Sequence, residues 1–196
     1  MCDSAKSVRR AGSKFLELCA ESGVSPVVIG GAALLIHGIP RRLNDLDVLA
    51  ETTGAQLGSL RTSVKRAGGR IHAVSELLRE GGQRHVRFFL QGLQVDLLRP
   101  WDARSRKTVS RATMGSWLGL DVRVVKLADA VVGQAQAGRW ADISRAWALI
   151  SKKLPESECR RLVEELHTLG YTSWATPNWS TKRGRDTHIP ARIPFL

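Results

Sequence analysis

The sequence predicts a mixed α/β (α+β) fold, in which a small mixed β-sheet is flanked by α-helices. Short apolar runs bounded by glycine or proline are typical of buried strands, and two such runs separated by Gln91-Gly92 indicate a β-hairpin. Elsewhere, apolar residues recur at three- and four-residue spacing, which indicates amphipathic helices. Because the helices interleave with the strands, we expect one sheet with its helices packed on one face.

In the first half of the chain, helical spacing ends before Gly23, and Pro26 introduces the first strand. The expected elements are a helix at 8–19, a strand at 27–29, a short helix at 32–37, a strand at 46–50 and a helix at 57–67. In the second half they are a strand at 70–74, hairpin strands at 85–90 and 93–98, and helices at 128–137, 143–150 and 158–169.

A length of 196 residues corresponds to about one domain. We expect this domain, with its C-terminal helices, to span residues 1–170. Residues 171–196 are rich in proline and basic side chains and have no clear period, so we expect an extended basic tail. A hydrophobic content of 43% excludes wholesale disorder.

The chain carries 30 Lys and Arg against 18 Asp and Glu, a net charge of +12, which favours a polyanionic partner or an anionic substrate. Cys2, Cys19 and Cys159 are far apart, without a CxxC pair, which fits a reducing compartment. The longest apolar run is interrupted by glycines and too short to span a bilayer. The expected localisation is therefore cytoplasmic, without membrane association.

The segment Asp45-Leu46-Asp47 carries the most chemical information. On a strand, the two carboxylates share one face while Leu46 faces the core. Asp96 lies within the apolar run 93–98, opposite its apolar face, and meets the other two if the strands are neighbours. Three such carboxylates suit divalent cations and phosphoryl or nucleotidyl transfer. The alternative is that Asp45 and Asp47 cap a turn in water.

Upstream, Gly30-Gly31 follows a strand and precedes a helix, which lets backbone N–H groups approach phosphate oxygens closely. Simple tight packing is the alternative explanation for this turn. The chain contains no GxxxxGK, GxGxxG, GxSxG or HExxH motif, so P-loop, Rossmann, hydrolase and metalloprotease assignments lack support.

The combined pattern resembles the signature of the nucleotidyltransferase superfamily, with its DNA polymerase beta-like fold. Residues 30–41, with the sequence GGAALLIHGIPR, followed by Asp45-Leu46-Asp47, match its glycine turn, short helix and Asp-x-Asp strand. The spacing resembles the branch of abortive-infection toxin nucleotidyltransferases. Residues 95–100 resemble the third-carboxylate strand of that branch, and Arg139-Trp140-Ala141-Asp142 resembles its later Arg-x-x-Asp helix start.

The resemblance implies a small mixed sheet flanked by helices, and Mg²⁺ (or Mn²⁺) held by Asp45, Asp47 and Asp96 as catalytic carboxylates. It also implies that Gly30 and Gly31 hold the triphosphate of an NTP such as ATP. An acceptor hydroxyl would attack the α-phosphate and pyrophosphate would leave. Asp96 would orient or deprotonate the acceptor, and Arg41 would steady phosphates or acceptor.

Two residues depart from that branch. Leu43 stands where a threonine is usual, and Gln134 stands where a lysine is usual. Loss of a triphosphate-contacting lysine would weaken nucleotide binding without removing the metal site. Residues 99–111 carry a net charge of +4 close to Asp96 and either guide an RNA acceptor or form a solvated loop. Trp174 and Trp179 of the tail either stack on bases or pin the tail to its domain.

The leading hypothesis is a Mg²⁺-dependent nucleotidyltransferase whose acceptor is an RNA end, particularly tRNA. Such an activity fits a toxin or phage-defence component with an antitoxin protein as a further partner. A protein hydroxyl or a small molecule such as an aminoglycoside is an alternative acceptor. The rival hypothesis is a catalytically silent nucleotidyltransferase-like module that binds RNA or protein.

Overall fold

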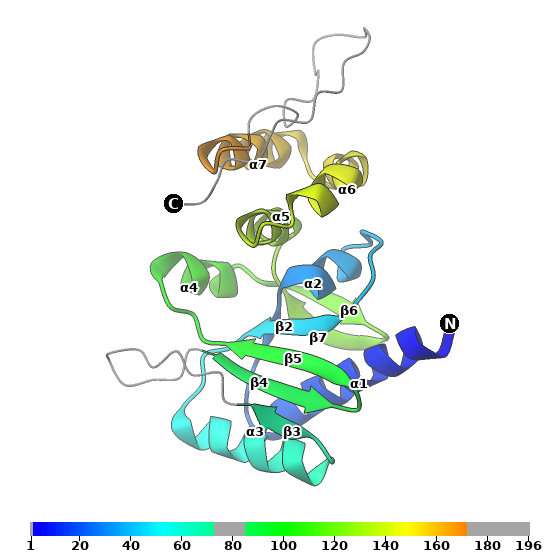
Figure 1. Ribbon diagram of the computed structural model, residues 1–196. Helices are drawn as coiled ribbons and strands as arrows, with labels where there is room; N and C mark the ends of the chain where they lie inside the picture. Colours follow the sequence, from blue (N-terminus) through cyan, green and yellow to red (C-terminus); the bar gives the residue numbers. More distant parts are fainter. Residues whose placement is uncertain (1, 73–84, 172–196) are drawn as a thin grey trace, which may run out of the picture.

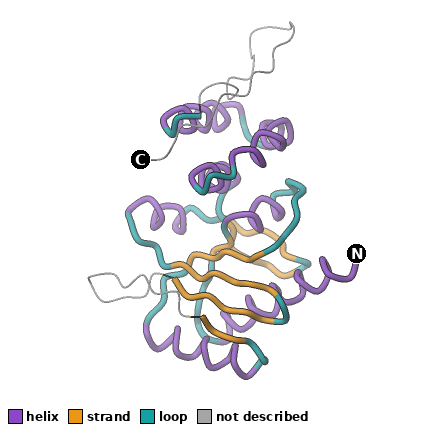
Figure 2. Tube along the Cα trace, in the orientation of Figure 1, coloured by secondary structure: helices purple, strands orange, loops and turns teal. Residues whose placement is uncertain are grey.

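The computed structural model describes residues 2–72 and 85–171, and residues 172–196 of the expected tail lie outside this part of the chain. It contains one seven-stranded mixed sheet in the order β3-β4-β5-β2-β1-β7-β6, flanked by seven helices among the described residues (Figures 1 and 2). The mixed α/β fold expected from the sequence is confirmed. The strands are β1 (Val27–Val28), β2 (Asp45–Leu49), β3 (Arg70–His72), β4 (His85–Leu90), β5 (Leu93–Leu98), β6 (Thr113–Trp117) and β7 (Leu120–Val124).

The helices are α1 (Cys2–Glu21), α2 (Gly30–Ile36), α3 (Gly54–Arg66), α4 (Ala103–Ser110), α5 (Leu127–Gln136), α6 (Trp140–Lys153) and α7 (Glu156–Thr168). They form two groups rather than the single layer expected. Helices α1 and α3 contact each other beside the sheet, whereas α2, α5, α6 and α7 form a second stack (Figure 1). The second stack arises because α5 presents apolar side chains on most of its circumference and so packs on α2, α6 and α7 together.

The centre of the sheet follows the alternation read from the sequence. Leu46 and Val48 of β2 pair with Val95 and Leu97 of the parallel strand β5, and all four side chains are buried. On the same face, Phe88 of β4 packs against Phe15 of α1, with ring centroids 5.3 Å apart. The apolar face of these strands is therefore covered by α1, and the residues between them project to the opposite face.

The β4–β5 hairpin turns where it was predicted, at Gln91 and Gly92, which both have positive φ. The second hairpin, β6–β7, was not predicted. Its turn, Leu118-Gly119, also has both φ values positive, but leucine is rare in such a turn and gives no sequence signal. Strand β6 is largely exposed and lacks an apolar alternation.

Residues 99–111, expected as either an RNA guide or a solvated loop, contain the helix α4. Asp102 caps this helix by accepting a hydrogen bond from the Ser105 backbone N–H at 2.6 Å, and Ser105 completes a capping box. Tyr171, expected as the first residue of the tail, belongs to the folded part. Its hydroxyl donates to the Ala135 carbonyl oxygen at 2.7 Å, and its ring stacks on Trp140.

None of the helices in residues 2–72 and 85–171 is both long and apolar enough to cross a membrane. Cys19 and Cys159 are buried free thiols, and burial raises the pKa of Cys19 to about 12.

Candidate functional site

The three carboxylates predicted from the sequence lie on one face of neighbouring strands. Asp45 and Asp47 alternate with the buried Leu46 on β2, and Asp96 pairs directly with Asp47 across the parallel β2–β5 ladder. We call the surface of β2, β4 and β5 that carries them the carboxylate face. It is opposite the face that α1 covers, so the strand register assembles the acids at the centre of the sheet.

Asp47 is held in an electrostatically unfavourable position. Burial, followed by the charges of Asp45 and Asp96, raises its pKa to about 6. A carboxylate of this kind is stabilised by a cation that neutralises it. Asp45 and Asp47 are both partly accessible, so their oxygens fit a divalent cation approaching from the carboxylate face.

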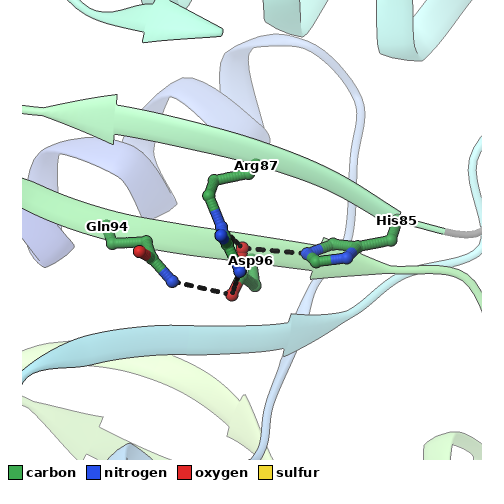
Figure 3. A network of polar contacts seen from close by, with 4 residues as sticks. All are labelled: His85, Arg87, Gln94 and Asp96. Atoms are coloured by element: carbon green, nitrogen blue, oxygen red, sulfur yellow. Dashed lines mark hydrogen bonds and ion pairs between the residues drawn. The ribbon is translucent and has the colours of Figure 1, made fainter. Parts of the chain in front are cut away.

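Asp96 is in a different environment, which the sequence did not reveal (Figure 3). Arg87, its direct partner on β4, donates from Nε to Asp96 Oδ1 at 2.8 Å and from Nη2 to Oδ2 at 3.0 Å. Gln94 Nε2 donates to the same Oδ2 at 3.0 Å, and His85 Nε2 lies 2.9 Å from Oδ1. Both oxygens are therefore engaged by neighbouring side chains.

This network sets the charge state of Asp96. Burial alone would raise its pKa, but hydrogen bonds from Arg87 and His85 outweigh burial, so the pKa is lowered. Asp96 is only 8% exposed and would be costly to leave charged without these partners. The sequence offered one signal for the pairing: Arg87 and His85 alternate with apolar residues on β4, which places them on the polar face of the hairpin.

As these side chains stand, Asp45 and Asp47 fit a divalent cation, whereas Asp96 would have to exchange its hydrogen bonds with Arg87 to become a ligand. Within residues 2–72 and 85–171, no group of three His, Cys, Asp or Glu side chains is arranged to hold a metal ion. The structure differs from the expected three-carboxylate cluster because Arg87 forms hydrogen bonds with the third carboxylate, Asp96.

Gly30 and Gly31 are the first two residues of α2, directly after β1 and Ile29, and this glycine turn lies against two charged side chains. Gly30 has φ of +62°, and a Cβ atom there would lie 2.6 Å from Asp47 Oδ2. A Cβ atom on Gly31 would lie 3.0 Å from Arg41 Nε and 3.1 Å from its Cζ. Because neither glycine has a side chain, the Asp47 carboxylate can approach the backbone of Gly30, and the Arg41 guanidinium can approach the backbone of Gly31.

Arg41 reaches this turn from the loop before β2 and is held from the other side by the helical stack. Its Nη1 donates to Gln134 Oε1 of α5 at 2.8 Å, and its Nη2 lies 3.7 Å from Asp142 Oδ2 of α6. Gln134 was noted in the sequence as a departure from the family pattern, and Asp142 as the acid of the Arg-x-x-Asp element. The structure brings both to Arg41.

The remaining residues considered in the sequence have structural contacts. His37 is the C-cap of α2, and its Nε2 lies 2.7 Å from the Val125 carbonyl oxygen, so this side chain is used in packing. Leu43 packs against the hydrophobic core. Trp117 is buried, and Trp140 and Trp147 pack against the core. Trp174 and Trp179 lie outside the described residues.

The basic residues at α4 are partly used in internal contacts. Arg104 pairs with Glu165 of α7, and Arg111 pairs with Asp129 of α5 at 2.6 Å. Arg99, Arg106 and Lys107 are exposed and form no ion pair with another residue of the described ranges. Fewer cations are thus available to a partner here than the net charge of the segment suggests.

No protein-family model and no curated protein matches the sequence. Similar solved structures exist. The crystal structure of ANT(2″)-Ia in complex with adenylyl-2″-tobramycin aligns with a TM-score of 0.59 at 17% identity, covering 83% of this chain and 98% of that one. The solution structure of the antibiotic-resistance factor ANT(2″)-Ia aligns with a TM-score of 0.61 at 15% identity, covering 85% and 94%.

A third similar structure is an antigenic nucleotidyltransferase-like protein from Paracoccidioides brasiliensis. It aligns with a TM-score of 0.52 at 19% identity and covers 84% of this chain and 88% of that one. These likenesses extend over the sheet and the helices together. They do not select the abortive-infection toxin branch. The chain therefore has the fold of the nucleotidyltransferase superfamily, as its glycine turn and Asp-x-Asp strand indicated.

Proposed function

We propose that this protein is a Mg²⁺- or Mn²⁺-dependent nucleotidyltransferase that moves an NMP from an NTP to an acceptor hydroxyl. The observation that carries the proposal is the Gly30-Gly31 turn, which has the Asp47 carboxylate against its first residue and the Arg41 guanidinium against its second. A metal-bound triphosphate needs both charges close together: carboxylates for the cation and a guanidinium for phosphate oxygens.

Asp45 and Asp47 would hold the cation. When bound, a divalent cation supplies charge neutralisation and Lewis-acid polarisation of phosphate oxygens. Asp96 is the third carboxylate of the proposed catalytic set and would join as a metal ligand once Arg87 turns away. Its lowered pKa favours orienting the acceptor hydroxyl over accepting its proton.

In the proposed reaction, the acceptor hydroxyl oxygen attacks the α-phosphorus, releases its proton to solvent water and forms a new P–O bond. The bond to the β-phosphate oxygen breaks, and pyrophosphate leaves with that electron pair. Gly30 and Gly31 have no side chains of their own, so a metal-bound triphosphate could lie close to the backbone between Asp47 and Arg41. Arg41 would contact phosphate oxygens of the bound NTP and so contribute to its affinity.

An RNA end, particularly of tRNA, is the proposed acceptor. The net charge of +12 supports a polyanionic partner, and the exposed Arg99, Arg106 and Lys107 follow the carboxyl end of β5, the strand of Asp96. Addition of a nucleotide to an essential RNA would halt translation. This consequence fits a cytoplasmic toxin or phage-defence component regulated by an antitoxin protein.

The structural likeness to ANT(2″)-Ia, a structure of which contains an adenylylated tobramycin, makes an aminoglycoside the alternative acceptor. A cationic drug requires an acidic acceptor pocket, and this chain has only 18 acidic residues against 30 basic ones. The charge therefore supports RNA over a cationic small molecule.

A catalytically silent module is the second candidate function. The observation in its favour is the Arg87–Asp96 ion pair, which occupies the third carboxylate. The burial of Asp47 beside the charges of Asp45 and Asp96, which raises its pKa, supports catalysis instead, because a silent site has no need to keep these acids together.

The test is a transfer assay with Mg²⁺, each of the four α-labelled NTPs, and total tRNA or tobramycin as acceptor. A D45N/D47N variant is the inactive comparison, and D121N, an exposed acid on β7, is the matched control. Label in RNA with the wild type and D121N, but not with D45N/D47N, is the expected result. Label in tobramycin would mean that the protein is a nucleotidyltransferase whose acceptor is an aminoglycoside and not RNA. No label, together with no Mn²⁺-dependent stabilisation of the wild type, would establish the silent module.

A further inference from the structure

Arg41 is held by three contacts from separate parts of the chain. Its guanidinium stands against Gly31, its Nη1 donates to Gln134, and its Nη2 lies 3.7 Å from Asp142. The Arg41 side chain is 21% exposed, so it reaches the surface at the turn. Buried Nε has no acceptor among the described residues. A guanidinium with one hydrogen bond to a neutral amide retains several N–H donors for an oxyanion.

The chemical nature of the Gln134 side chain matters at this position. Gln134 is only 8% exposed and lies on the side of α5 that packs inward. Its amide oxygen accepts a hydrogen bond from Arg41 without cancelling the positive charge. A carboxylate there would orient the guanidinium equally well but would neutralise it, and a lysine would repel it.

We infer that Gln134 is a positioning residue that holds the Arg41 guanidinium over the Gly30-Gly31 turn with its charge intact, and that the Gln134–Arg41 pair is the polyphosphate-binding cation of this protein. The inference rests on the proposed function and deepens it, because it assigns NTP affinity to a residue of α5 that touches no reacting atom. It also gives the helical stack of α5 and α6 a part in nucleotide binding.

The test compares Q134E, which neutralises Arg41, with Q136E, the same change at an exposed position of α5. In the transfer assay, Q134E raises the KM for NTP about tenfold and changes kcat less than twofold, whereas Q136E changes neither. Q134M, which removes the acceptor without adding charge, also raises the KM and covers the case in which Q134E does not fold. R41M raises the KM by itself, and R41M/Q134E raises it no further than R41M alone, because both changes remove one interaction.

Calorimetric titration with inorganic triphosphate gives a readout that needs no acceptor. A loss of triphosphate affinity in Q134E but not in Q136E supports the inference, even if no acceptor is labelled and the proposed transfer fails. Wild-type KM and triphosphate affinity in folded Q134E would overturn the inference while leaving transfer intact. Additive effects of R41M and Q134E, or no triphosphate binding by the wild type, would overturn it as well.

Discussion

The carboxylate of Asp47 occupies the space beside Gly30, with Oδ2 2.6 Å from the position of a Cβ atom on that glycine. Gly30 also has φ of +62°, a conformation that disfavours any residue with a side chain. The two residues are therefore matched: the glycine is required both for the turn and for the approach of the acid. This relationship joins the glycine turn to the Asp-x-Asp strand.

A G30A variant tests this relationship. The methyl group would push Asp47 aside and would strain the backbone, at a cost of about 1–2 kcal/mol in the free energy of unfolding. We expect loss of Mn²⁺-dependent stabilisation and of transfer, measured by thermal unfolding and by the labelling assay. G58A is the matched control, because Gly58 lies inside α3 with no atom within 4 Å of an added Cβ. The free energy of unfolding of G58A should be roughly 0.5–1 kcal/mol higher than that of the wild type. Intact metal response in G30A would contradict the proposed role of the turn.

Removal of the Asp47 charge should stabilise the protein in the absence of metal. Its folded-state pKa is about 6, above the ordinary value of 3.8, so the fold favours the protonated form. The Asp47 charge therefore lowers the free energy of unfolding. This effect is absent at pH 3, develops between pH 4 and 6, and is complete above pH 6.

D47N should therefore raise the free energy of unfolding by about 1–3 kcal/mol at pH 8 in EDTA, and by much less near pH 4. Urea unfolding at the two pH values measures this difference. D121N, at an exposed position, should show little effect at either pH. A D47N variant that is less stable than the wild type at pH 8 would show that Asp47 is not under electrostatic repulsion.

Removal of Arg87 should make the carboxylate face more attractive to a metal. R87M leaves Asp96 without its two arginine hydrogen bonds, which should cost about 1–3 kcal/mol of stability in metal-free buffer. The variant should then gain more stability from Mn²⁺ than the wild type does, because a competing cation has gone.

The matched control is R160M on α7, where Arg160 pairs with Glu156 at the surface. R160M should change neither the stability in metal-free buffer nor the stability gained from Mn²⁺, since exposed ion pairs contribute little. An equal Mn²⁺ response in R87M and the wild type would mean that Asp96 does not take part in metal binding.

If Arg41 binds phosphate as proposed, Asp142 should compete with it for the guanidinium. Its Oδ2 lies 3.7 Å from Arg41 Nη2, and its carboxylate is 42% exposed. D142N should therefore lower the KM for NTP by a few fold without changing kcat, at low ionic strength, and the effect should shrink as salt is added. The control is E156Q, which removes an acid from α7 and should leave the KM unchanged. An increase in KM in D142N would indicate that Asp142 orients Arg41 rather than competes for it.

The sequence predicted the central strands well because their signals are local. Apolar residues alternate with Asp45 and Asp47 on β2 and with Gln94 on β5, and the Gln91-Gly92 turn fixes the register of β4 with β5. The β6–β7 hairpin and α4 were missed for the opposite reason. The hairpin depends on contacts with other elements, such as Trp117 Nε1 donating to the Arg9 carbonyl oxygen of α1 at 3.1 Å. Helix α4 has a local capping box at Asp102 and Ser105, and the arginines at its two ends pair with Glu165 and Asp129 of other helices.

The sequence by itself determined the fold class, the hairpin and the acidic residues of the candidate site, because strand periodicity and turn chemistry act over a few neighbouring residues. Only the tertiary structure decided which charges accompany those acids. Arg41 and Gln134 are 93 residues apart, and Arg87 reaches Asp96 across a strand pair. Such long-range pairing depends on how helices and strands pack, and packing is a property of the whole chain. Gln134, a departure from the family pattern in the sequence, lies in the structure as the acceptor that holds an arginine.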